Sequence, residues 1–185
     1  LCTLHFQKEN TIDNITSTIL FGDGCAAVLM QNNSNEKGIS INNFFSQVAF
    51  KGKADMAWNL SAKGFLMTLS GYVPNLVEQD FDNLVNKALQ NSLLDKSEIT
   101  HWCIHPGGKK ILEAIEKSIL LPQGSLAHSY NVLKDYGNMS SPTILFVLQN
   151  IFDELKGQRE NNKAKIFGAA FGPGLTMETF IASYD

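Results

Sequence analysis

The stretch "ITHWCIHPGGKKILEAIEKSIL" most narrows the range of folds open to this chain of 185 residues. A short apolar run leads into a proline and two glycines, and isoleucines and leucines then recur at helical spacing. This order predicts a buried strand that ends near His105, a tight turn, and a helix over residues 109–120. Passage from a strand through a glycine turn into a helix is typical of layered α/β proteins.

The rest of the chain continues this alternation of strands and helices. Apolar runs predict a buried strand over residues 24–30, and strands over 39–50 and 57–69 that pair through a turn near "KGKAD". Helical spacing predicts helices over residues 73–94 and 140–155, and two strands around "GPG" close the chain. The fold class expected from this order is α/β.

Composition excludes several kinds of partner. The net charge of −3 gives no electrostatic support for binding nucleic acid. No apolar run is long enough to span a membrane. The three cysteines form no CxxC pair, which suits a reducing compartment, so we expect a cytoplasmic protein.

Asn138 lies in "DYGNMSSPTILF", just ahead of a predicted helix. Ser140 or Ser141 is a natural N-cap residue, and Pro142 suits the first turn. An amide held at a helix N-terminus can donate a hydrogen bond to an oxygen that gains negative charge during a reaction. An ordinary turn residue is the alternative interpretation of Asn138.

His105 ends the strand of the opening stretch. Ligands of α/β proteins bind at the carboxyl ends of strands, and the glycines that follow allow a substrate chain to approach the backbone. A structural histidine beside a tight turn is the alternative. A metal site is not expected, because side chains of His101, Cys103 and His105 on one strand would be about 6.6 Å apart for neighbours and about 13 Å for the outer pair.

Several other residues allow a purely structural interpretation as well as a functional one. Lys109 and Lys110 could meet a phosphate or form a solvated helix start. His128 and Tyr130 are expected in a loop. Cys25 is predicted to be a core cysteine, and Cys103 either a core cysteine or the partner of His105 in a Cys-His pair. Phe44, Phe45 and Phe50 are predicted to be core residues or the lining of an acyl pocket.

Four motifs, "LFGDG", "HPGG", "YGNMSS" and "FGPGLTMET", follow one another in this order. Together they resemble the type III polyketide synthases, the chalcone-synthase-like enzymes of the thiolase superfamily, over essentially the whole chain. The resemblance implies a homodimeric enzyme with a five-layer αβαβα thiolase-like fold, whose half seen here is a three-layer αβα unit with a mixed sheet. It further implies that residues 1–38 are the tail of the N-terminal half and residues 39–185 the C-terminal half.

The resemblance also implies an activity. Such enzymes are acyltransferases that join malonyl-CoA to an acyl-CoA starter by decarboxylative Claisen condensation, with a Cys-His-Asn triad. His105 and Asn138 match the histidine and the asparagine. Neither a metal nor a cofactor is implied, because coenzyme A thioesters are the substrates.

The nucleophilic cysteine of this family precedes the segment that resembles "LCTLHFQ". Cys2 is expected on a strand instead, so we expect these 185 residues to lack the nucleophile and to be inactive alone. The resemblance assigns substrate contacts to Phe21, Met67, Gly107, Gly108, Gly172, Pro173 and Gly174.

The sequence leaves two alternatives open. The chain could be a relative of the ketoacyl synthases or of hydroxymethylglutaryl-CoA synthase, although the HQAN and GNTSA motifs usual in ketoacyl synthases are missing. It could also be a non-catalytic half that binds acyl-CoA.

Overall fold

A mixed sheet of four strands forms the centre of the molecule. The computed structural model describes residues 8–32, 37–62, 64–158 and 163–184. Within these ranges the strand order is β1 (Ile39–Val48), β6 (Thr176–Tyr184), β5 (Ala164–Gly172) and β4 (His101–Ile104). The first three strands are antiparallel neighbours, whereas β4 runs parallel to β5. The carboxyl ends of β4 and β5 therefore lie at the same edge of the sheet.

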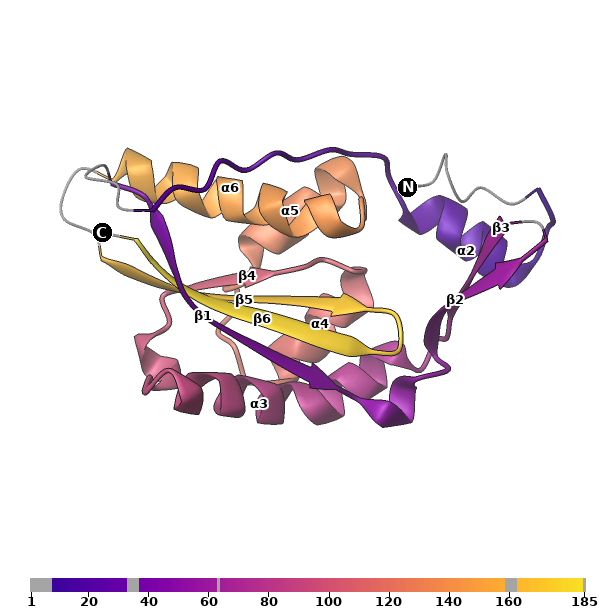
Figure 1. Cartoon of the computed structure of the whole chain (residues 1–185), viewed down its shortest axis with the longest axis horizontal. Helices are drawn as coiled ribbons and strands as arrows, with labels where there is room; N and C mark the ends of the chain where they lie inside the picture. Colours follow the sequence, from indigo (N-terminus) through magenta and orange to yellow (C-terminus); the bar gives the residue numbers. More distant parts are fainter. Residues whose placement is uncertain (1–7, 33–36, 63, 159–162, 185) are drawn as a thin grey trace.

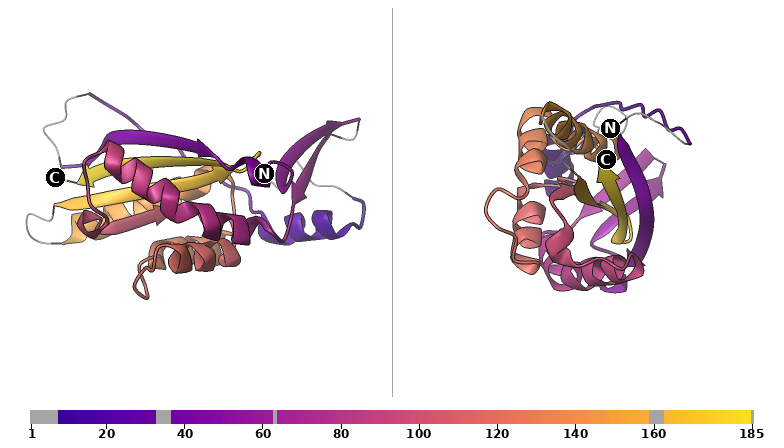
Figure 2. Two further views of the ribbon diagram at one scale, coloured as in Figure 1. Left: turned by 90° about the horizontal axis from the view of Figure 1, so that it is seen from below. Right: turned by 90° about the vertical axis from the view of Figure 1, so that its left-hand side faces the viewer.

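Helices cover both faces of this sheet (Figures 1 and 2). The helices α5 (Ala127–Tyr136) and α6 (Ser141–Gly157) lie on one face, and α3 (Val73–Asn91) and α4 (Lys109–Ser118) on the other. Phe167 of β5 packs in the core under α3 and α4, and its neighbour Ile166 packs in the core under α6. Successive strand residues point to opposite faces, so one strand serves both cores. The three-layer αβα fold with a mixed sheet is confirmed.

Two further elements extend beyond one end of the sheet in Figure 1: helix α2 (Ile12–Leu20) and the hairpin of β2 (Met56–Ser61) and β3 (Gly64–Leu69). The predicted pairing of residues 39–50 with 57–69 was wrong. β1 pairs with β6, and residues 57–69 fold back on themselves as β2 and β3. Gly64, with φ of 105°, permits this reversal, which a side chain would resist.

Residues 24–30 form no strand, which corrects a second expectation. They run as an extended coil over α6 (Figure 1), and Leu29 is 93% exposed. Cys25, expected in the core, is exposed as well. An apolar run becomes a strand only when its backbone groups find a neighbour to pair with, and no described strand lies alongside this one.

The remaining differences concern aromatic residues and one helix. Phe44 and Phe50 are exposed, and only Phe45 of that group packs against the core. His128 and Tyr130 lie in helix α5, not in a loop. This helix buries only Ser129 and Val132 along its length, so its apolar stripe is too short to be recognised.

Short 3-10 turns, η1 (Phe50–Gly52) and η2 (Lys96–Glu98), complete the described elements. None of the helices in these ranges has the length and apolar character needed to cross a membrane. Cys2, expected on a strand, lies outside the described residues.

Candidate active site

His105 follows directly after β4 at the carboxyl edge of the sheet. Its backbone N–H donates to the carbonyl of Ala169 on β5 over 2.8 Å, which continues the parallel ladder by one residue. Its carbonyl then accepts from the N–H of Gly107 over 2.9 Å, and this tight turn redirects the chain into α4. The backbone of His105 is thereby fixed at the end of the strand, as the position of the glycines predicts.

The imidazole of His105 is buried, with 7% of the residue exposed, and it has no hydrogen-bond partner among the described residues. Burial lowers its pKa to about 4, so the ring is neutral near pH 7. A neutral imidazole carries one N–H donor and one acceptor nitrogen. A buried polar group without a partner is costly, and a ligand in the adjacent cavity would relieve that cost.

Asn138 is held beside the segment that contains Phe21. The Asn138 N–H donates to the Leu20 carbonyl over 3.1 Å, and the Asn138 carbonyl accepts from the Gly22 N–H over 2.9 Å. This short parallel bridge joins the end of α2 to the start of α6. It therefore brings Phe21 and Asn138, distant in sequence, to one place.

The amide orientation of Asn138 is set by two hydrogen bonds. Its Oδ1 accepts from the backbone N–H of Ser140 over 2.8 Å, and its Nδ2 donates to the carbonyl of Gly107 over 3.2 Å. The second N–H of the amide has no acceptor in the described part of the chain. Asn138 is thus tied to the same turn that follows His105.

The turn around Asn138 carries backbone strain. Gly137 has φ of 70°, which glycine adopts readily, but Ser140 has φ of 66°. A serine in that region costs about 1–3 kcal/mol, and such strain gathers at functional sites. Ser140 is the N-cap residue of α6, as predicted, although its side chain makes no capping hydrogen bond and α6 begins at Ser141.

One cavity of about 410 Å³ lies next to His105 and Asn138. This volume is in the range of small-molecule sites, and most of the lining side chains are apolar. The structure brings eight of the nine residues singled out in the sequence to its wall: His105, Asn138, Phe21, Met67, Gly107, Gly108, Gly172 and Pro173.

Gly174, the ninth, is not among the lining residues. It lies in the β5–β6 turn with φ of 77°, and its N–H donates to the carbonyl of Met56 over 2.6 Å. A Cβ atom added at Gly174 would meet nothing within 4 Å. Its place in the structure is accounted for by the turn and by the link to β2.

Each of the two glycines of the His105 turn has room for one more carbon beside the cavity. A Cβ atom at Gly107 would lie 3.8 Å from Cδ2 of His105, and one at Gly108 would lie 3.6 Å from Cδ1 of Leu20. Both are ordinary van der Waals distances. Neither glycine has a φ that favours glycine, so the described fold does not require glycine at these positions. A ligand that passes close to the backbone would require it.

Sequence reasoning missed the contribution of the β2–β3 hairpin. Its residues Met56, Trp58 and Leu69 line the cavity beside Met67, and Met67 also accepts a hydrogen bond from Ser17 of α2 over 3.8 Å. The turn at Gly64 was the available signal, since recognising a hairpin would have placed both of its strands together.

The cysteines that the structure describes lie elsewhere. Cys103 is fully buried on β4, its thiol donates to the carbonyl of Ile144 over 3.6 Å, and burial raises its pKa. It is an inert core residue, as expected. Neither Cys103 nor the exposed Cys25 lines the cavity.

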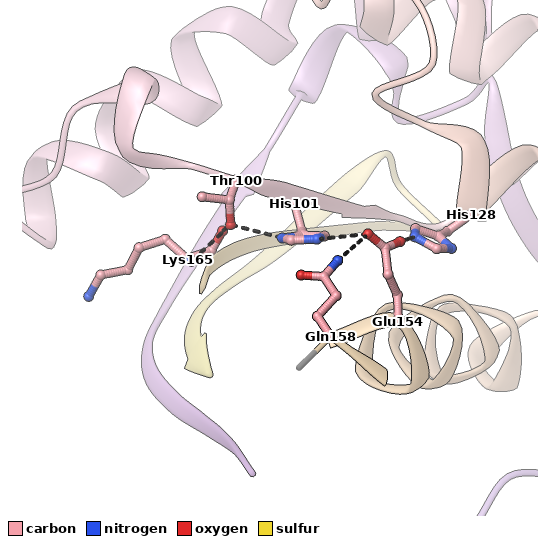
Figure 3. Close-up of polar contacts among 6 residues, drawn as sticks. All are labelled: Thr100, His101, His128, Glu154, Gln158 and Lys165. Carbon is pink, nitrogen blue, oxygen red and sulfur yellow. Dashed lines mark hydrogen bonds and ion pairs between the residues drawn. The ribbon is translucent and has the colours of Figure 1, made fainter. Parts of the chain in front are cut away.

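His101 begins β4 and therefore lies at the opposite end of this strand from His105. Figure 3 shows Glu154 of α6 between His101 and His128, with its two oxygens 3.8 Å and 2.7 Å from their Nε2 atoms. Gln158 also donates to Glu154, over 3.2 Å. This cluster ties α5 and α6 to the start of β4, away from the cavity.

The four-stranded mixed sheet between helices, with a histidine and an asparagine at one cavity, matches half of the thiolase-like fold of a solved type III polyketide synthase. The model of the C-terminal domain of chalcone and stilbene synthases matches residues 41–183. The chain therefore belongs to the chalcone and stilbene synthase family, the type III polyketide synthases.

Known relatives agree with this assignment. The chain is 32% identical over 193 residues to a putative chalcone synthase of Bacillus subtilis, with 100% of this chain and 52% of the relative covered. It is 29% identical to the alpha-pyrone synthesis polyketide synthase-like protein Pks18 of Mycobacterium tuberculosis, with 96% and 46% covered.

Solved structures give the same picture of the fold. The 1,3,6,8-tetrahydroxynaphthalene synthase of Streptomyces coelicolor superimposes with a TM-score of 0.89 at 25% identity, covering 100% of this chain and 52% of that one. PKS-I of the brown alga Ectocarpus siliculosus superimposes with a TM-score of 0.85 at 23% identity, covering 100% and 51%. The chain spans about half the length of the curated relatives that it matches.

Proposed function

We propose that this chain is the C-terminal half of a type III polyketide synthase that condenses malonyl-CoA with an acyl-CoA starter, and that His105 and Asn138 hold the reacting thioester carbonyl. The observation that carries the proposal is the pairing of a buried, unpartnered imidazole with an oriented amide at one cavity. Each group has an N–H donor without an acceptor among the described residues, as two donors to one oxygen would require. The match to the chalcone and stilbene synthase family argues against the alternatives of a ketoacyl synthase or a hydroxymethylglutaryl-CoA synthase relative.

Decarboxylation is the step that these two donors assist. The bond between C2 of the malonyl group and its carboxylate breaks, carbon dioxide leaves, and the electron pair forms an enolate whose negative charge lies on the thioester oxygen. Donors fixed beforehand at that oxygen stabilise the charge without reorganising. The enolate carbon then attacks the acyl carbonyl on the nucleophilic cysteine, and the new C–C bond forms as the thiolate leaves.

The neutral state of His105 suits this role. With its pKa lowered to about 4 by burial, the ring keeps one N–H donor near pH 7 without a net charge that would have to be solvated in the cavity. A thiolate beside the ring would favour its protonated form, so the pKa of His105 rises once the nucleophile is present. We place that nucleophile in the part of the protein that precedes Leu1.

We further propose that residues 1–38 belong to the N-terminal half and residues 39–185 to the C-terminal half of a cytoplasmic homodimer. Helix α2 supports this division, because Ile12, Ile15 and Ile19 are all exposed here. A helix with three exposed isoleucines is expected to pack against another part of the complete protein.

The test uses the full-length protein with its upstream cysteine. Incubation with malonyl-CoA and a panel of acyl-CoA starters, followed by mass spectrometry, should yield extended products. The 185-residue chain alone should bind acyl-CoA without turning it over. Full-length protein that binds the substrates but forms no product with any starter would favour a non-catalytic acyl-CoA-binding half instead.

A further inference from the structure

The cavity has an unusual distribution of charge. Lys109 and Lys110 line it, and among the described residues at its wall there is no aspartate or glutamate. Of the lining residues that the structure describes, His105 is the only other titratable one, and its ring is neutral near pH 7. Lys109 and Lys110 are therefore the basic residues of a cavity whose described wall is otherwise mostly apolar.

The helix to which they belong adds to this positive potential. Lys109 and Lys110 are the first two residues of α4, whose first turn contains no acidic side chain. The N-terminus of a helix is itself positive and carries N–H groups without helical partners, so cations there are electrostatically unfavourable. Lys109 is compensated by Glu113, 3.5 Å away, whereas Lys110 has no ionic partner in the described ranges.

We propose that Lys110, supported by Lys109, pairs with a phosphate of a coenzyme A-type thioester whose reacting end lies at His105 and Asn138. This inference rests on the proposed function and adds a phosphate contact made by the C-terminal half itself. A second feature also points to a bound ligand: the buried, unpartnered imidazole of His105 faces the same cavity.

The order of groups along the turn assigns the lysines to the phosphate end. The cavity wall contains His105, then the side-chain-free positions Gly107 and Gly108, and then Lys110, in chain order. A thioester anchored at His105 would pass its pantetheine arm over the glycines and bring its phosphates toward α4. A cation beside the malonyl carboxylate would instead stabilise the charge that must leave as carbon dioxide, and so would oppose the reaction.

Calorimetric titration of the 185-residue chain with coenzyme A, 4′-phosphopantetheine and pantetheine tests the contact. Lys110→Gln should weaken coenzyme A binding about five-fold, the upper range for a pair of exposed charges, and leave pantetheine binding unchanged. Lys134→Gln removes an equal charge from an exposed residue of α5 outside the cavity and should change neither. Thermal stability of Lys110→Gln should be equal to or higher than wild type, because a cation leaves a helix N-terminus.

The three ligands separate the possible outcomes. If Lys110→Gln weakens both phosphorylated ligands, the contact is with the pantetheine phosphate; if it weakens coenzyme A alone, the contact is with the nucleotide phosphates. Equal coenzyme A affinity of Lys110→Gln and wild type overturns the proposal. It is also overturned if wild type binds coenzyme A and 4′-phosphopantetheine no more tightly than pantetheine. In those cases pantetheine binding still supports the proposed function, whereas a chain that binds neither pantetheine nor coenzyme A contradicts the proposed substrate class as well.

Discussion

The buried imidazole of His105 should make the stability of the fold depend on pH. An ordinary histidine has a pKa near 6.5, and in the folded chain burial lowers that of His105 to about 4. Between these values the unfolded chain binds a proton that the folded chain does not, so stability falls as pH falls. The linkage relation gives a loss of about 2 kcal/mol between pH 7.5 and pH 5.0 and about 3 kcal/mol once pH is below 4.

The measurement is urea unfolding of wild type and of His105→Gln at pH 7.5, 6.0 and 5.0. Glutamine does not titrate, so the variant should lose about 2 kcal/mol less than wild type over this range, whatever its stability at pH 7.5. Comparing slopes cancels the contribution of the carboxylates, which titrate in both proteins.

His101 provides the comparison. Burial lowers the pKa of His101 too, but the Glu154 carboxylate acts to raise it. His101→Gln should change the slope in the same direction but less. Equal slopes for wild type and His105→Gln would refute the conclusion that the imidazole is buried without a partner.

Three further substitutions test the geometry of the cavity. Gly108→Ala should change the melting temperature little, because the added Cβ meets only Leu20 at 3.6 Å, yet it should weaken acyl-CoA binding in a titration; a large loss of stability would show that the fold needs this glycine. Trp58→Ala enlarges the cavity, so the full-length enzyme should release longer products by mass spectrometry, and an unchanged product profile would contradict its position at the wall. Glu154→Gln should cost less than about 1 kcal/mol in urea unfolding and leave acyl-CoA binding intact, because its contacts are half-exposed and remote from the cavity.

The part of the site built from strand ends and turns could be predicted from the sequence. His105 and Asn138 are both followed by turn residues and a helix start, and such junctions gather at the carboxyl edge of an α/β sheet. The apolar stripes of α3 and α4 were long enough to be recognised, and both helices begin within a residue of the predicted start.

Features that depend on distant partners could not be predicted. Residues 24–30 have the composition of a strand, but pairing is decided by neighbours that the local pattern does not reveal. Trp58 reaches the cavity only because the chain reverses at Gly64, and that turn gave a weak signal. The bridge between Phe21 and Asn138 joins segments whose proximity no local pattern records.

The central claim is that His105 and Asn138 together stabilise the enolate. Its most direct test is the release of labelled carbon dioxide from carboxyl-labelled malonyl-CoA by the full-length protein without any starter. The account predicts that His105→Ala and Asn138→Ala each lower the rate at least about 100-fold while malonyl-CoA still binds, since one fixed donor to a developing oxyanion is worth about that much. A folded variant that releases carbon dioxide at the wild-type rate would contradict the account.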